Sequence, residues 1–545
     1  MEANKPGAQC HSRMTSPITI RPRIGAVIYN RTSVSFSIRI DCGVRYLRVQ
    51  SMKWLAAGAL LVLVGATGCG SQYRPVITPV PPTGPAAQPT AYVLVFSQPG
   101  LVAPNSLPAS APPCPATAYA NPGVATIIDF AGDSIMAQAE IGTGPLTFAL
   151  NATGGEAYSL NCDNTMSTVP VSITLQTKNV GSSTFFSGAA PFNMLASTTT
   201  EYIVEQGRNA VGAFTGNPPS LAQEVKAAPS LINVTGAPGA QRVFAISQGN
   251  SSANGGVTWG QCATPSLVTA NGEADGIEVA TNTISSRLTL GVCPVYGITS
   301  ADGLRTFIMN RGSGTVSVIN NQLNQLDTAP NPNFNNGPNT NLGSNATINL
   351  CPGTTGTCNA GPVYAQTYTV GNMLVTSNFD NNTVSFIDVS LDIYGNDSAT
   401  FGKVLGTAKV GANPASFTIL QDGSRVYTAN EGDGTVTVVN MSSFTPQATI
   451  PVSGTPSSAN TITGTMIPQP RTIDSAYNYP TGKVYVTAQN SQFVTVIRTD
   501  TDVVSAAIQV QGNVVDLHTT AQYTSSSVTS GNLNVQSHAV GSGIP

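Results

Sequence analysis

One phrase of four short segments recurs along this 545-residue chain at intervals of roughly 40 to 65 residues. Its clearest copies begin at Val124, Val384 and Val484. Each copy holds an alternating segment such as RVYTAN, a Gly/Asp/Asn turn, a second segment such as TVTVVN, a loop, a third such as PQATIPV, and then G-x-x-P. Apolar and polar residues that alternate with a period of two between turn residues are typical of antiparallel strands. The repeat therefore predicts an all-β protein built from four-stranded units.

The composition fits this class and excludes others. Gly (53) and Pro (38) are abundant but aperiodic, which excludes collagen and favours a turn-rich β protein. Hydrophobic residues make up 41 %, enough to bury a core, so a charge-rich disordered chain is excluded. Only 9 % of residues are charged, 23 basic against 26 acidic, and no cationic field is available for a phosphate backbone. We therefore expect no nucleic-acid partner.

The repeated phrase resembles the YVTN family of β-propeller repeats, whose idealised form runs YVTN, a turn, TVSVID, a loop, TIPVG and P. The matching segments are 427–430, 484–488, 315–320 (TVSVIN), 383–388 (TVSFID) and 411–414 (GANP). The resemblance implies a β-propeller over roughly residues 91–518, and it is strongest after residue 296. Residues 328–362, which include NPNFNNGPNTNLGSN, are too long and polar for a blade strand and predict a protruding loop.

The number of blades is predicted from the second strand of each unit. The eight candidates lie near Tyr92, Tyr158, Tyr202, Phe244, Phe307, Leu374, Tyr427 and Tyr485. Because the units near Tyr202 and Phe244 are degenerate, we predict seven or eight four-stranded blades. TAYVLVF near Tyr92 lacks a preceding innermost strand, and NVVDL from Asn513 supplies one, so a blade shared by both ends should close the ring.

Residues 52–68 predict an export signal. Residues 54–66 are apolar and uncharged, too short to cross a membrane but suited to a signal-peptide core. With ATGC ending at Cys69, the segment resembles a bacterial lipoprotein signal whose cysteine is lipidated, although Ala66 stands where that family prefers Leu. Ordinary cleavage after Ala66 is the alternative. Residues 69–90 are proline-rich and predict an extended tether.

Residues 1–51 differ in composition from the rest of the chain. They hold eight Lys/Arg against two acidic residues, which leaves 15 basic and 24 acidic residues in the remainder. We predict that this stretch is a disordered, mis-assigned upstream start and that translation begins at Met52. The alternative is a basic cytoplasmic extension before a signal anchor. The other end of the chain, 519–545, is a Ser/Thr/Gly-rich tail for which we expect partial disorder.

The cysteines agree with export. Without Cys10, Cys42 and Cys69, an even number remains, as suits disulfides in an oxidising compartment. We predict three pairs, with buried or free thiols as the alternative: Cys351–Cys358, Cys262–Cys293 and Cys114–Cys162. Neither C-x-x-C nor Cys/His spacing suggests zinc.

Few residues in this sequence are candidates for catalysis. The only histidines are His11, His518 and His538, and no nucleophile elbow, Walker loop or H-E-x-x-H motif occurs. His518 lies at the end of an inner strand, where we interpret it as a lone packing or surface residue. The acidic turns 379–382, 430–434 and 161–164 could offer oxygen to Ca²⁺, but Asn, Asp and Gly are also what tight hairpins require. Glu201 and Glu205 lie in a strand-and-turn region, so nothing makes them an acid/base pair.

The sequence predicts a non-enzymatic binding or scaffold module. We expect no catalytic residue, metal or cofactor, and a monomer lipid-anchored in the cell envelope, at the outer membrane or cell surface. Its expected partner is a protein, glycan or envelope component. Two alternatives remain: an enzyme, because YVTN propellers are similar to lactonase-type and quinoprotein dehydrogenase-type propellers, and a surface-layer or adhesion protein.

Overall fold

The computed structural model describes four short strands between residues 26 and 45, and then residues 91–100, 114, 121–249, 262, 264–351, 359–368, 372–478, 481–520 and 535–538. The chain divides into two compact units, 1–76 and 77–545. In the first, β1 (Ala26–Ile28) pairs with β2 (Val34–Phe36), and β3 (Ile38–Ile40) with β4 (Gly43–Arg45). The predicted signal, Cys69 and the tether lie outside the described residues. No described helix has the length and apolar character to span a membrane.

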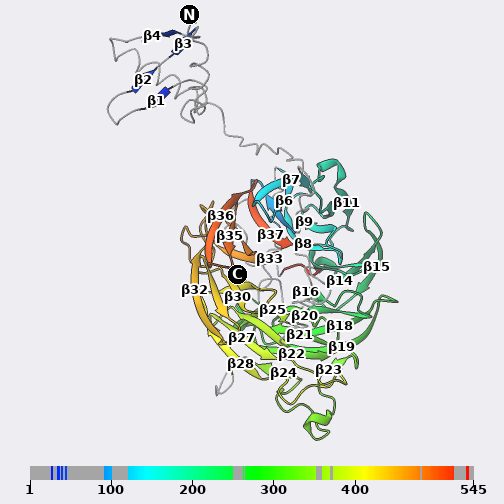
Figure 1. Cartoon of the computed structure of the whole chain (residues 1–545). Coiled ribbons are helices and arrows are strands. Elements are labelled where there is room, and N and C mark those ends of the chain that lie inside the picture. The colour runs from blue at the N-terminus through cyan, green and yellow to red at the C-terminus, as the bar shows by residue number, and fades with distance from the viewer. Residues whose placement is uncertain are drawn as a thin grey trace, which may run out of the picture. The chain divides into compact units, whose positions relative to one another are not determined.

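The second unit is an eight-bladed β-propeller, with each blade an antiparallel sheet of four main strands (Figure 1). The strands of each blade are given from the channel outward. The first four blades are: first, β37 (Asn513–Thr519), β5 (Tyr92–Gln98), β6 (Gly123–Asp129), β7 (Ser134–Ile141); second, β8 (Pro145–Leu150), β9 (Glu156–Asn161), β10 (Thr165–Pro170), β11 (Gly181–Thr184); third, β12 (Pro191–Ala196), β13 (Glu201–Glu205), β14 (Ala210–Thr215), β15 (Ser220–Lys226); fourth, β16 (Leu231–Thr235), β17 (Arg242–Ser247), β18 (Asn271–Glu278), β19 (Thr283–Val292). The other four are: fifth, β20 (Pro294–Thr299), β21 (Arg305–Asn310), β22 (Thr315–Asn320), β23 (Gln325–Leu326) with β24 (Thr347–Asn349); sixth, β25 (Pro362–Tyr368), β26 (Met373–Asn378), β27 (Thr383–Asp388), β28 (Val404–Lys409); seventh, β29 (Pro414–Ile419), β30 (Arg425–Asn430), β31 (Thr435–Asn440), β32 (Thr445–Pro451); eighth, β33 (Pro470–Asn478), β34 (Thr481–Ala488), β35 (Phe493–Arg498), β36 (Val503–Gln509).

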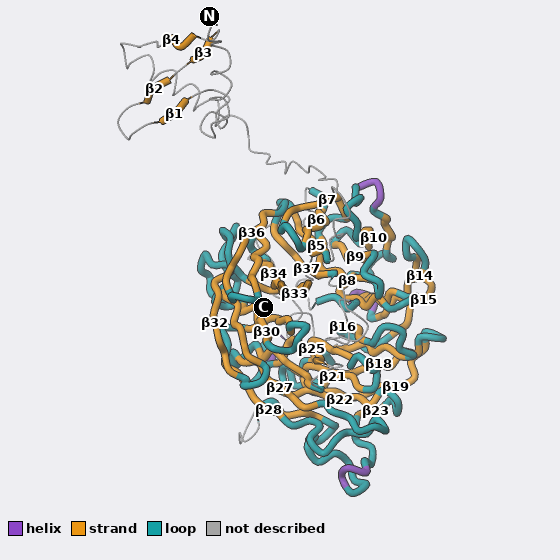
Figure 2. The backbone as a smooth tube through the Cα atoms, in the orientation of Figure 1, coloured by secondary structure: helices purple, strands orange, loops and turns teal. Residues whose placement is uncertain are grey.

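The predicted fold class is confirmed, and the number of blades is the higher of the two predicted. All eight predicted second-strand residues lie on the second strand of a blade, including Tyr202 on β13 and Phe244 on β17 in the two degenerate units. Strands dominate the trace of the ring, and the described helices are short 3₁₀ turns such as η6 (Pro332–Phe334) (Figure 2).

The two ends of the propeller meet in one blade, as the sequence predicted. Strand β37 pairs antiparallel with β5, with Asn513 opposite Gln98 and Thr519 opposite Val93. The inner strand of this blade therefore comes from the C-terminal part of the chain and its other three strands from the N-terminal part. In a closed ring every blade packs between two neighbouring blades, and only short strand edges remain exposed.

In four blades, an asparagine at the end of the second strand holds the second and third strands together. Asn310 donates from Nδ2 to Thr315 Oγ1 (3.2 Å) and Ser317 Oγ (2.9 Å) on the neighbouring strand. The same pair of bonds recurs in three further blades, from Asn161, Asn378 and Asn430. Buried amides require such partners, so an Asn before the turn and Ser or Thr after it form one structural unit.

The tyrosines of three second strands join neighbouring blades. The hydroxyl of Tyr485 donates to Asp133 (3.1 Å), that of Tyr202 to Asn282 (3.1 Å), and that of Tyr427 to Asp502. Each acceptor lies in the turn before the outer strand of the next blade and has a positive φ, between 50° and 54°. Asp and Asn tolerate this backbone conformation better than most residues.

The predicted protruding loop interrupts the outer strand of the fifth blade. Strand β23 pairs with the end of β22, the chain then leaves the sheet, and β24 returns to pair with its beginning. The intervening residues 327–346 project from the ring near β23 and β24 (Figure 1) and contact the loop 389–402 of the next blade. We call these two segments the lobe. Its asparagines Asn331 and Asn339 are buried and donate hydrogen bonds to Asp397, so this low-complexity stretch is packed against the loop 389–402.

Two disulfides are present among the described residues, and both are pairs that the sequence predicted. Cys114 is bonded to Cys162, and Cys262 to Cys293. Cys351 is also disulfide-bonded, whereas its predicted partner Cys358 lies outside the described residues.

Removal of the Cys262–Cys293 disulfide should lower the stability of the propeller. The bond spans 31 residues, and the chain-entropy relation for a closed loop of this length gives about 3 to 4 kcal/mol. The double variant C262S/C293S should therefore unfold at a lower urea concentration than the oxidised parent. The parent measured in reducing buffer is the control. Equal midpoints for oxidised parent and double variant would show that this bond does not constrain the unfolded chain.

Candidate functional site in the central channel

The inner strands present equivalent side chains from all eight blades. Each inner strand has a shift of register near its beginning, and the residue after the shift occupies the same position in every blade. These residues form a first ring: Thr147, Asn193, Asn233, Tyr296, Tyr364, Ser416, Thr472 and Asp516. Two residues further along, on the same face of each strand, is a second ring: Ala149, Leu195, Thr235, Ile298, Gln366, Thr418, Asp474 and His518.

Polar members of the rings bond to the inner strand of the next blade. Asp516 accepts from the Thr147 hydroxyl (2.7 Å) and the Phe148 amide (3.3 Å). Asp474 in turn accepts from the amide (2.8 Å) and hydroxyl (3.0 Å) of Thr519. These bonds satisfy buried carboxylate oxygens and fix the position of β37 between its two neighbours.

Residues 535–538 of the C-terminal tail lie in the channel and are buried. Val535 accepts from the Ala196 amide on β12, and the Ser537 amide donates to the Met194 carbonyl on the same strand. The Gln536 side chain donates to the Gly297 carbonyl on β20 (2.7 Å). These four residues of the tail, for which the sequence predicted partial disorder, contact several inner strands from different parts of the ring.

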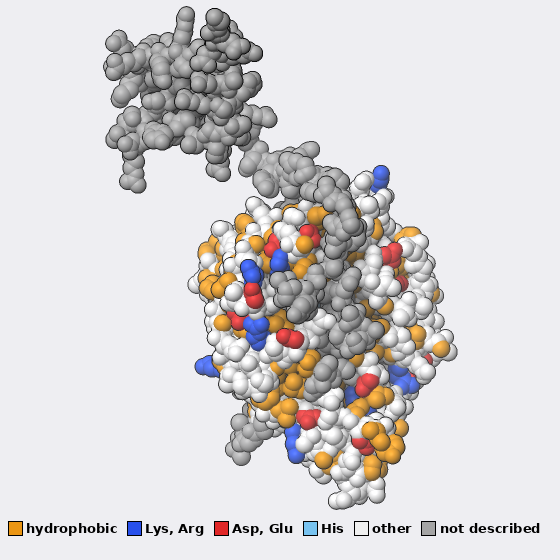
Figure 3. All heavy atoms as spheres, in the orientation of Figure 1, with side chains coloured by type: hydrophobic (Ala, Val, Ile, Leu, Met, Phe, Trp, Pro, Cys, Tyr) orange, Lys and Arg blue, Asp and Glu red, His pale blue; other side chains and the backbone are white. Residues whose placement is uncertain are grey.

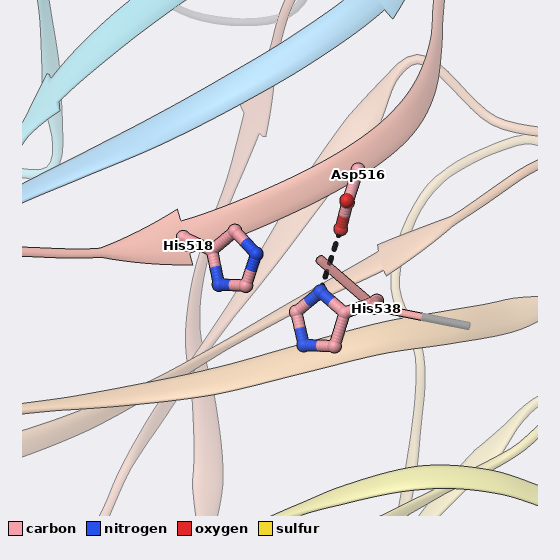
Figure 4. A group of neighbouring side chains, drawn as sticks. All are labelled: Asp516, His518 and His538. Atoms are coloured by element: carbon pink, nitrogen blue, oxygen red, sulfur yellow. Dashed lines mark hydrogen bonds and ion pairs between the residues drawn. The ribbon is translucent and has the colours of Figure 1, made fainter. Parts of the chain in front are cut away.

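His538 of this segment meets two residues of β37. Its Nδ1 lies 2.8 Å from Asp516 Oδ1, and its ring stacks on that of His518 with centroids 4.2 Å apart and planes 8° apart (Figure 4). His518 Nε2 lies 3.1 Å from the Phe148 carbonyl oxygen. Asp516, His518 and His538 each offer one ligand atom within 4.8 Å of the others, and all three are buried. We call them the channel triad.

The channel triad is an electrostatically coupled group. Burial would raise the pKa of Asp516, but the two neighbouring imidazoles outweigh it and hold that pKa below its usual range. Burial would lower the pKa of His538, but Asp516 and Asp474 hold it above its usual range. Asp474 has a raised pKa because burial disfavours its charged form. The charged Asp516–His538 pair is therefore the favoured state.

Of the two interpretations of His518, packing is confirmed and a surface position is wrong, and the residue is not a lone histidine. It is buried against Phe148, whose ring it meets edge-on at 4.7 Å, and it lies beside a second histidine. The sequence missed this group because His538 lies twenty residues further along a stretch without periodicity. The only available signal was that the two histidines are the last two in the chain.

The acidic turns do not converge on one another. As predicted, 161–164, 379–382 and 430–434 connect second and third strands. Their carboxylates have local partners: Asp163 accepts from the Thr143 amide, Asp380 pairs with Arg311, and Glu431 pairs with Arg471. Within the part of the chain that the structure describes, the channel triad is the one group with the spacing of metal ligands.

Glu201 and Glu205 lie at opposite ends of β13, where they pair with Phe214 and Ala210. Strand geometry places residues four apart about 13 Å from one another. They therefore do not form an acid/base pair. Both are buried, and burial raises the pKa of each carboxyl to about 7.

The substitution Glu205→Gln should make stability less dependent on pH. The folded chain holds the Glu205 proton up to about pH 7, whereas the unfolded chain releases it near pH 4.5. The parent therefore loses stability as pH rises through this window, by about 3 kcal/mol for this carboxyl. Urea unfolding between pH 5 and pH 8.5 should show a smaller loss for E205Q, with the contribution of Glu201 retained. Identical slopes for the two proteins would contradict the assignment.

Charged side chains lie scattered over the face of the propeller seen in Figure 3, and no basic patch is visible there.

Comparisons with known proteins identify the fold and no family. Neither known family models nor curated proteins match the chain. Among solved structures, dihydro-heme d1 dehydrogenase NirN in complex with DHE is 11 % identical, with a TM-score of 0.51 over 79 % of this chain and 75 % of that one. AztD from Citrobacter koseri is 10 % identical, with a TM-score of 0.49 over 79 % of this chain and 98 % of that one. Streptogramin B lyase is 13 % identical, with a TM-score of 0.41 over 64 % of this chain and 91 % of that one. At such identities the likeness concerns the fold alone.

Proposed function

We propose that this protein is a non-enzymatic β-propeller of the cell envelope that binds a protein, glycan or envelope component through the faces of its ring. The observation that supports this proposal is the occupation of the central channel by residues 535–538 of the same chain. Polar side chains of the inner strands form hydrogen bonds to this segment or to the neighbouring blade. Because the channel is filled in this way, little room and few polar groups remain for a substrate. Binding through loops on a rigid scaffold is a common use of such folds.

The proposed location rests on the sequence around Cys69. We propose that this cysteine carries the lipid anchor, that 69–90 is the tether, and that the propeller is a YVTN-type monomer held at the outer membrane or cell surface. The recurrence in four blades of bonds from the Asn at the end of the second strand to two Thr or Ser hydroxyls supports the proposed kinship with YVTN repeats.

The anchor is tested in cells that make the protein. The full chain should sediment with membranes and yield a lipid-modified N-terminal peptide beginning at Cys69. The variant Cys69→Ser should remain soluble or uncleaved. A parent chain whose N-terminal peptide carries no lipid would remove the basis for the proposed location.

The binding role is tested with the purified protein and isolated envelope fractions. Saturable co-sedimentation with peptidoglycan sacculi or outer-membrane vesicles supports a binding module. Turnover of lactones, or of alcohols with an added quinone cofactor, would instead favour the enzyme alternative. Concentration-dependent self-assembly in light scattering would favour a surface-layer protein.

A further inference from the structure

We propose that the channel triad is a binding site for one divalent transition-metal ion of the Zn²⁺ type, and that His538 brings one of its ligands from the C-terminal tail. This inference is independent of the proposed binding role, because it concerns the channel and not the outer faces.

The residue types are those that such ions prefer. Two imidazoles and one carboxylate form a three-ligand set of the kind that holds Zn²⁺ with a fourth position for water, and borderline ions favour imidazole nitrogen over carbonyl oxygen. Calcium is disfavoured because it takes six to eight oxygen ligands. The buried position of Asp516, His518 and His538 excludes bulk water from the site.

The surroundings of His518 match those of a metal ligand. A carbonyl oxygen can only accept a hydrogen bond, so His518 Nε2 must carry the hydrogen that points to Phe148. In the neutral ring, Nδ1 then carries the lone pair. A ligating imidazole commonly donates its other N–H to a backbone carbonyl or a carboxylate in this way, which fixes the ring and its tautomer.

The charge balance of the channel also favours a cation. Asp474 and Asp516 are both buried, and Asp516 lies beside His538 in the channel triad. A divalent ion bound there would place positive charge beside the two carboxylates.

Coordination requires one small rearrangement. Lone pairs of imidazole nitrogens lie in the ring plane, and the two rings are parallel at 4.2 Å, so they do not converge on one point. Rotation of the His538 ring about its Cβ–Cγ bond, a broad torsion, would turn one of its nitrogens toward the ion while His518 keeps its bond to the Phe148 carbonyl. Since His538 lies in the tail, metal binding should also favour the docked position of 535–538.

The test uses the purified full chain without a histidine tag, stripped with a chelator and titrated with Zn²⁺ alone by calorimetry. We expect one Zn²⁺ per chain and at least a tenfold loss of affinity in His518→Ala, His538→Ala and Asp516→Asn. His518→Ala leaves the contact of His538 with Asp516 in place and so separates ligation from docking of the tail. The matched control is Ser537→Ala, which loses the hydroxyl bonds to Asn193 and the Met194 amide but no ligand; its affinity should stay within a few-fold of the parent.

A second measurement avoids variants that fail to fold. Co²⁺ added to the stripped parent should give the intense visible bands of a four-coordinate site. Absence of stoichiometric binding, weak bands typical of exposed six-coordinate Co²⁺, or full affinity in folded His518→Ala would each overturn the proposal.

Discussion

A chain that ends at Gly512 should not form the propeller. It lacks β37, whose Val514 and Leu517 are buried in the core and whose backbone pairs with β5 from Gln98 to Val93. Burial of these two side chains contributes about 2 kcal/mol each, and each strand-pairing hydrogen bond about 1 kcal/mol. The total is on the order of 10 kcal/mol, comparable with the whole stability of a typical domain. We expect aggregation or a partly folded species in size-exclusion chromatography and circular dichroism.

A chain that ends at Thr520 is the matched control. It keeps β37 and the bond from the Tyr92 amide to Thr520 Oγ1 (2.8 Å), and loses only the tail with 535–538. It should fold and unfold cooperatively, at a temperature somewhat below that of the full chain because the contacts of the tail in the channel are lost. If the two truncated chains melt alike, closure by β37 does not stabilise the ring.

Arg305→Ala should have the second largest effect. Arg305 begins β21 and is almost fully buried, with Nε 2.5 Å from Asp327 and Nη2 2.7 Å from Asp397, one from each segment of the lobe. Removal of the guanidinium leaves two buried carboxylates without their cation. Loss of one partner from such a buried ion-pair group lowers the free energy of unfolding by about 3 to 5 kcal/mol, because the uncompensated carboxylates remain buried and unsolvated.

Urea unfolding of the variant measures this loss, and an exposed pair provides the control. Arg498 and Asp500 are about half exposed, so Arg498→Ala should cost less than about 1 kcal/mol. The cost of Arg305→Ala should shrink at low pH, because burial and the neighbouring Asp327 raise the pKa of Asp397 to about 6 and the carboxyl accepts a proton below that value. Similar losses for the two variants at pH 7 and above would show that the lobe does not depend on Arg305.

Most of the fold could be predicted because the signals are local and repeated. The period-two pattern and the turn residues identified the second strand of all eight blades, and the incomplete unit at Tyr92 identified the shared blade. Each of the two described disulfides joins two cysteines that follow one another along the chain with no other cysteine between them. The lobe was recognised as an insertion, but its internal bonds were not, because Arg305, Asp327 and Asp397 belong to three separate segments.

The candidate site could not be predicted in the same way. Asp516 and His518 were visible as part of an inner strand, but nothing in a Ser/Thr/Gly-rich tail indicates that 535–538 returns to the channel. The contacts of His538 with Asp516, and of Ser537 with Asn193, join positions far apart in sequence or separated by residues without a pattern.

The sequence by itself determined the class of fold, its repeated unit and the way in which the ring closes, since each strand and turn carries its own local pattern. Only the tertiary structure decided what fills the channel and which ionisable groups meet there. The reason is physical: alternation and turn chemistry act between neighbouring residues, whereas the pairing of buried charges depends on where eight separate inner strands converge.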